Sequence, residues 1–92
     1  MSGGVADLVK MAENNEQAAK MAMDAGARFG YDASREALEY ADIARQLRLA
    51  AAEIAVMAPD KQPMYVARMK AAVWARLDDS PELGDDHSEA HP

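Results

Sequence analysis

Two histidines near the C-terminus and several closely spaced carboxylates are the side chains of this sequence that could bind a metal ion or act in catalysis. His87 and His91 are four residues apart with Glu89 between them, a spacing that lets two imidazoles on one helix hold a divalent metal ion. They follow Pro81 in a stretch rich in Gly, Asp and Ser, where no rigid element is expected to position them. We therefore predict neither a metal site nor a general base at these histidines.

Other carboxylate pairs, such as Glu36 and Glu39, fall on a helix face that is expected to meet water. Solvated carboxylates of this kind are typical of a helix surface and not of general acid–base catalysis. The chain has no cysteine, which excludes disulfides, thiol chemistry and thiolate zinc sites. No strand followed by a glycine-rich phosphate loop is expected. The sequence thus predicts a protein that is not an enzyme and has no cofactor.

The length and charge of the chain favour one small domain followed by an acidic tail. Of the 92 residues 21 are alanine, so the supply of large apolar side chains is modest. Residues 1–77 carry ten basic and ten acidic side chains, and the net charge of −6 therefore comes from the last fifteen residues. We expect a helical domain over residues 1–79 and a flexible acidic tail over residues 80–92.

Composition also bears on the partners and the location of the protein. The neutral domain lacks the single-sign basic field typical of a nucleic-acid-binding protein. The longest apolar run, residues 49–52, is too short to span a bilayer, and no signal peptide precedes the first predicted helix. We expect a cytoplasmic protein that contacts neither membrane nor nucleic acid.

Any site in this chain would be built on helices, and residues 34–57 give the clearest helical signal. Apolar residues with alternating 4-3 spacing keep one stripe on one side of a helix, and small residues in that stripe allow a second helix to approach closely. The positions of this helix-packing seam are Ala37, Tyr40, Ala44, Leu47, Ala51 and Ile54.

A second stripe lies in residues 5–29, with small residues Ala12, Ala19 and Gly26 at one seam position and Gly30 as the stop. Two such stripes joined by a short turn predict an antiparallel helical hairpin. The first helix either continues through Asn14 or breaks and restarts there, because Asn14 and Gln17 have capping-box spacing. Asn15 then serves either as part of that break or as a seam amide that fixes helix register.

The remaining elements complete a small all-α three-helix bundle. Pro59 is expected to end the second helix, and Pro63 suits the first turn of a third helix over residues 63–77. Asp32 or Ser34 is expected to cap the second helix. The third helix has its own apolar stripe: Val66, Met69, Val73 and Leu77.

The second half of the 34–57 helix is apolar on nearly all sides, which indicates burial on more than one side. Contacts are therefore expected with the third helix, with a partner protein, or with both. Trp74 lies off the stripe of the third helix beside basic residues, a position typical of an interface anchor. The candidate partner-binding residues are Leu49, Val56, Met57, Met69, Lys70 and Trp74.

These features predict a protein–protein interaction module: a regulator, adaptor, chaperone or inhibitor subunit that packs an apolar helix face on a partner or on another copy, as in a homodimer. One alternative is an acidic mimic that blocks a basic nucleic-acid-handling protein through its tail. A second is a helix-turn-helix regulator, in which Ala22 and Gly26 precede a recognition helix beginning near Ser34. Glu36 and Glu39 on that helix would repel phosphates.

Overall fold

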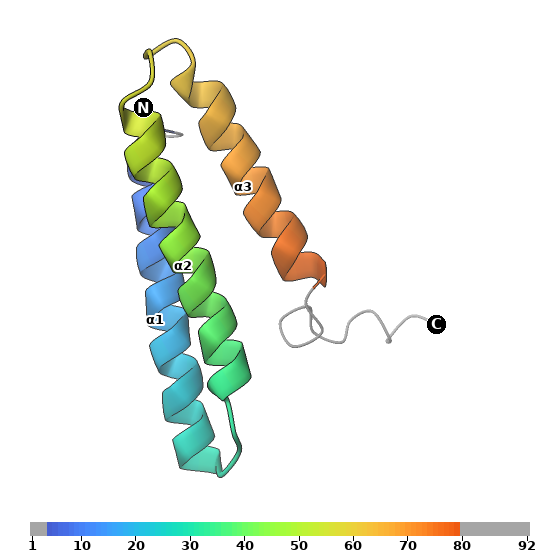
Figure 1. Ribbon diagram of the computed structural model, residues 1–92. Helices are drawn as coiled ribbons and strands as arrows, with labels where there is room; N and C mark the ends of the chain where they lie inside the picture. Colours follow the sequence, from blue (N-terminus) through green and yellow to red (C-terminus); the bar gives the residue numbers. More distant parts are fainter. Residues whose placement is uncertain (1–3, 80–92) are drawn as a thin grey trace.

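The computed structural model describes residues 4–79, which form three α-helices with no strand in that range (Figure 1). Helix α1 spans Val5–Phe29, α2 spans Ser34–Ala55 and α3 spans Gln62–Asp79. α1 and α2 lie side by side and antiparallel, and α3 leans away from them toward its C-terminal end (Figure 1). The predicted all-α hairpin with a third helix is confirmed. The predicted acidic tail over residues 80–92, with both histidines, lies outside the described residues.

α1 is continuous through Asn14 and Asn15, so the alternative of a break at Asn14 is wrong. The side-chain Nδ2 of Asn15 donates a 2.8 Å hydrogen bond to the carbonyl oxygen of Met11, one turn earlier. This bond satisfies the half-buried amide within its own helix, so paired asparagines do not end the helix here.

The turn between α1 and α2 requires glycine at two positions. Gly30 has φ of 78°, in the left-handed region, and its N–H and that of Tyr31 donate to the carbonyl of Gly26 at 2.8 and 2.9 Å. A Cβ on Gly26 would lie 2.7 Å from the carbonyl oxygen of Tyr31 and 3.0 Å from the Cβ of Ala33. Only glycine lets the returning chain come this close to α1.

The N-cap residue of α2 is Ala33, with no side-chain cap hydrogen bond, so the predicted cap by Asp32 or Ser34 is wrong. Asp32 instead bonds to Ser34, the first residue of the helix. The Oδ1 atom of Asp32 accepts hydrogen bonds from the Ser34 hydroxyl at 2.6 Å and from the Ser34 backbone N–H at 3.0 Å. The bond from the hydroxyl, followed by the bond from the backbone N–H, lowers the pKa of the Asp32 carboxyl.

α1 and α2 pack along the heptad seam read from the sequence. Ala44 and Ala51 are 1% and 3% exposed, so the alanine series faces the neighbouring helix and not water. Tyr40 and Ala19 are half-buried, and the other seam positions are buried: Ala12, Gly26, Ala37, Leu47 and Ile54.

The core is unevenly distributed along the hairpin. Its largest fully buried side chains, Leu8, Ile43, Leu47 and Val66, lie toward the end that α3 covers. Near the α1–α2 turn the buried cluster contains only alanines: Ala22, Ala33 and Ala37. Each buried Leu, Ile or Val stabilises a fold by about 1.5–3 kcal/mol, and a single methyl group by much less. Packing therefore stabilises the turn end of the hairpin far less than the opposite end.

The boundaries of α2 and α3 differ from the predicted ones by one or two residues. α2 ends at Ala55, because the N–H groups of Val56 and Met57 donate to carbonyls only three residues earlier, at 3.3 and 2.9 Å. α3 begins at Gln62, whose Nε2 donates to the carbonyl of Met57 at 3.1 Å, and Pro63 occupies its first turn.

Candidate interaction surface

The predicted partner-binding residues Leu49, on α2, and Val56, directly after the last residue of α2, are solvent-exposed. Their exposed fractions are 54% and 86%. Seam alanines of α2 face α1, whereas Ala50, Ile54 and Met57 line the contact with α3, so Leu49 lies on the remaining, outer side of the helix. Val56 follows the end of the helix. The second half of α2 is therefore apolar on three sides. One side packs on α1, one packs on α3, and one is exposed to solvent.

The other predicted partner-binding residues belong to α3 or to its contact with α2. Met57 and Met69 are half-buried against the core and line the contact between these helices. Trp74 is 61% exposed and lies one turn beyond Lys70 on α3. Since α3 and the outer side of α2 are separate faces, the structure does not bring Trp74 together with Leu49 and Val56.

Two of the basic residues of α3 form ion pairs with acidic residues of the hairpin. Lys70 Nζ lies 2.8 Å from Asp7 Oδ2, and the guanidinium of Arg76 lies 2.9 Å from both Glu39 Oε1 and Asp42 Oδ2. Burial opposes the charge of Arg76, but its hydrogen bonds to Asp42 and Glu39 outweigh burial and raise its pKa. Lys70 and Arg76 therefore stabilise the contact of α3 with the hairpin and do not form a free basic surface.

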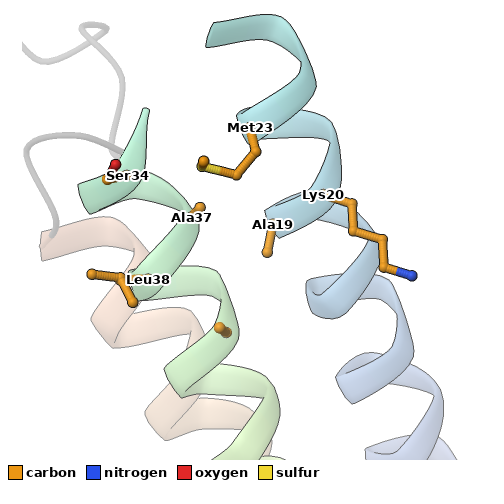
Figure 2. A pocket seen from close by; sticks show the side chains of 7 residues that line it. Ala19, Lys20, Met23, Ser34, Ala37 and Leu38 are labelled. Carbon is orange, nitrogen blue, oxygen red and sulfur yellow. The ribbon is translucent and has the colours of Figure 1, made fainter. Parts of the chain in front are cut away.

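An apolar groove of about 600 Å³ runs between α1 and α2 near their turn (Figure 2). Met23 extends from α1 toward α2, and Leu38 lies on the α2 side of the groove (Figure 2). These two side chains are 50% and 68% exposed. The full lining is Ala19, Lys20, Met23, Ser34, Ala37, Leu38 and Ala41.

α3 leaves this groove uncovered, because it lies behind α2 when the groove is viewed from the front (Figure 2). The alanine-only packing explains why the groove exists. Methyl groups at Ala19, Ala37 and Ala41 allow close approach of the helices but do not fill the channel that runs along their contact.

Arg48 and Glu16 connect α2 to α1 next to the groove. The Nε and Nη2 atoms of Arg48 donate to the two carboxylate oxygens of Glu16 at 2.7 and 2.9 Å, a bidentate geometry. Glu16 lies one turn from Ala19, and Arg48 lies two turns from Ala41, so the pair is on the same face as the groove. The hydrogen bond lowers the pKa of Glu16 and raises that of Arg48.

Sequence reasoning assigned Ala19 and Ala37 to the packing seam and did not identify Met23, Leu38 or Ala41 as lining an open groove. The available signal was Leu38, a large apolar residue between two glutamates in the first turns of α2. A second signal was the run of small seam residues near the turn: Ala19, Gly26 and Ala37.

Comparisons with protein-family models, with curated proteins and with solved structures found no match for the chain. Within residues 4–79, no group of three or more His, Cys, Asp or Glu side chains is placed to hold a metal ion. The helices in this described range are also not apolar over a length that could cross a membrane. The groove and the exposed apolar residues near it are therefore the features on which a functional assignment can be based.

Proposed function

We propose that the protein is a small helical interaction module that binds another protein chain through the side of the α1–α2 hairpin opposite α3, here called the open face. The open face consists of the groove with Met23 and Leu38 and the adjoining ionic band of Glu13, Glu16, Arg45 and Arg48. In the cell such a module acts as a regulator, adaptor, chaperone or inhibitor subunit. The observation that supports this most is the uncovered groove between two otherwise tightly packed helices.

The chemistry of the groove favours a helix of a partner protein over a small molecule. Small-molecule sites are enclosed and carry a few convergent polar groups that fix the ligand. This groove is open, and Ser34 and Lys20 are its only polar lining residues among those described, with the Lys20 ammonium pointing away from it (Figure 2). An amphipathic helix placed in a groove needs only apolar contacts at spacings of three and four residues.

The helix-turn-helix alternative has little geometric support. That motif crosses its two helices at about 90–120° so that the second can enter the major groove. α1 and α2 instead lie side by side (Figure 1). The acidic-mimic alternative depends on the tail, which lies outside the described residues, and it predicts release of the partner at high salt.

Affinity capture with the full chain as bait tests the proposed function, using extracts of cells that produce the protein naturally. We expect wild-type protein to retain a partner protein at both low and high salt, and Met23→Glu to lose it. Met64→Glu is the matched control, because Met64 on α3 is also 50% exposed and lies away from the open face. Capture that is identical for all three baits, or that disappears only at high salt, would contradict binding through the groove.

A further inference from the structure

We propose that the chain bound by the open face is a second copy of this protein, and that two hairpins pack through their open faces as a two-fold symmetric four-helix bundle. This inference rests on the proposed function and names its partner. α3 lies on the opposite side of each hairpin and would remain outside the bundle (Figure 2).

Symmetry restricts how two identical faces can meet. The two-fold axis must lie in the plane between them, either parallel to the helices or perpendicular to them. A parallel axis keeps every residue at its own level and places α1 of one copy over α2 of the other. Each helix then has only antiparallel nearest neighbours, as in up-and-down four-helix bundles.

The charges of the open face favour the parallel axis. The ionic band carries Glu13 and Glu16 on α1 and Arg45 and Arg48 on α2. The Glu16–Arg48 contact places these two residues at one level, with Glu13 about one turn away on one side and Arg45 about one turn away on the other. With the parallel axis, Glu16 would lie opposite Arg48 of the second copy and one turn from its Arg45, and Glu13 would lie one turn from Arg48 of that copy. With the perpendicular axis, α1 would lie over α1 and the glutamates would face each other, which is unfavourable.

The arginines have donors left for such contacts. Arg48 uses two of its N–H groups on Glu16, and Arg45 forms an ion pair with Asp42. A guanidinium has five N–H donors, so each arginine can donate to a carboxylate of the second copy without losing its present partner. Both arginine side chains are also accessible, with 46% exposure for Arg48 and 62% for Arg45.

The same arrangement brings the two grooves together. Met23 and Leu38 line one groove and therefore lie at nearly the same level along the hairpin. A parallel two-fold axis would place Met23 of each copy against Leu38 of the other. The two large side chains would then fill the channels that the seam alanines leave open, and both would be removed from water.

The available area is sufficient for a weak to moderate dimer. α2 has 22 residues and is about 33 Å long at about 1.5 Å per residue. Two helices about 8–10 Å apart form a face roughly 18 Å wide, hence about 600 Å² per copy and about 1,200 Å² in total. This is the lower end for specific interfaces, so we expect a dimer that dissociates in the micromolar range.

Sedimentation velocity of the full chain over a concentration series in that range tests the proposal. We expect wild-type protein to convert from monomer to dimer. Met23→Glu and Leu38→Glu should each raise the dissociation constant at least about tenfold, because each buries a charge in the interface. Met64→Glu should leave it unchanged. Circular dichroism of each variant checks that the helices remain formed.

A second pair of variants tests the charge arrangement. Glu13→Arg should weaken the dimer severalfold, because the new cation would lie one turn from Arg48 of the second copy. Glu53→Arg makes the same change of charge at an exposed position of α2 that lines the contact with α3, and it should have little effect. Equal effects of these two variants would overturn the parallel arrangement.

Three outcomes separate this inference from the proposed function. Wild-type protein that stays monomeric throughout overturns the dimer, as does a dimer that tolerates both Met23→Glu and Leu38→Glu. Monomeric protein that still captures another protein in a Met23-dependent manner leaves the proposed function standing. Monomeric protein with no Met23-dependent capture overturns both.

Discussion

The guanidinium of Arg76 on α3 lies 2.9 Å from the carboxylate of Asp42 on α2, and at the same distance from that of Glu39. All three side chains are 33% exposed, so the contact is partly shielded from solvent. It joins the C-terminal half of α3 to the middle of the hairpin, where the ribbons diverge (Figure 1). Arg76 therefore links the C-terminal half of α3 to the hairpin.

Replacement of Arg76 by methionine should release the C-terminal half of α3 and leave the hairpin intact. Methionine keeps the apolar stem but removes the charge that holds the two carboxylates. Amide hydrogen exchange should become faster in residues 73–77 and unchanged in α1. Arg68→Met is the control, because Arg68 lies over the Tyr65 ring at 5.6 Å on the same helix and holds no carboxylate in the described contacts. Equal effects of the two variants would contradict this role of Arg76.

Stability should depend on pH through Asp42, which pairs with Arg45 on its own helix as well as with Arg76. Hydrogen bonds from Arg45 and then from Arg76 lower the pKa of Asp42 below its ordinary value of 3.8. A carboxyl with a lowered pKa in the folded state stabilises the fold fully above its unfolded-state pKa. That contribution is lost as the pH falls through the lowered folded-state value. Thermal unfolding of wild type and Asp42→Asn should therefore differ at neutral pH and converge in strong acid.

A methyl group on Gly26 should destabilise the hairpin. Its Cβ would lie 2.7 Å from the carbonyl oxygen of Tyr31, a backbone atom that cannot move without displacing the turn. We expect Gly26→Ala to lower the free energy of unfolding by about 1–3 kcal/mol in a urea titration. Gly4→Ala provides the comparison, because nothing lies within 4 Å of a Cβ built there.

Truncation of Leu47 should have the larger effect of two leucine substitutions on α2. Leu47 is fully buried in the core, whereas Leu49, two residues later, is 54% exposed. We expect Leu47→Ala to lower the free energy of unfolding by about 2–5 kcal/mol. Leu49→Ala should change it by less than about 0.5 kcal/mol. Similar values for the two would show that α2 is rotated from the orientation described above.

Trp74 reports which face a partner covers, because it is the only tryptophan and lies on α3. Its 61% exposure predicts long-wavelength fluorescence emission. Dimerisation through the open face should leave the emission maximum unchanged over the concentration series, because α3 lies on the other side of the hairpin. A blue shift on association would instead favour Trp74 as an interface anchor.

Heptad spacing was sufficient to predict the hairpin, because alanines at every seventh position, such as Ala37, Ala44 and Ala51, have few alternatives to packing on a neighbouring helix. It did not resolve the helix through Asn14, since both a continuous helix and a break are compatible with the local sequence, and the hydrogen bond from Asn15 to Met11 is visible only in the folded chain. Helix propensity alone is a weak guide where tertiary packing also acts.

The groove and the position of α3 were beyond prediction for a different reason. Arg76 meets Glu39 and Asp42 across more than thirty positions of sequence, and no local pattern marks such a contact. Met23 and Leu38 each look like ordinary surface residues until the two helices are placed together. Local periodicity thus predicts which helices pack, and only the assembled structure reveals what their packing leaves open.

The uneven core of the hairpin has a consequence for how the protein would respond to binding. One end of the hairpin is stabilised by large buried side chains: Leu8, Ile43, Leu47 and Val66. Local unfolding should therefore begin at the other end, near Gly30, where the buried cluster contains only alanines. That end also borders the groove. A chain bound there would suppress that fraying directly. Association and local ordering would thus be coupled events, and the slowest-exchanging amides of the free protein would be the ones least altered by its partner.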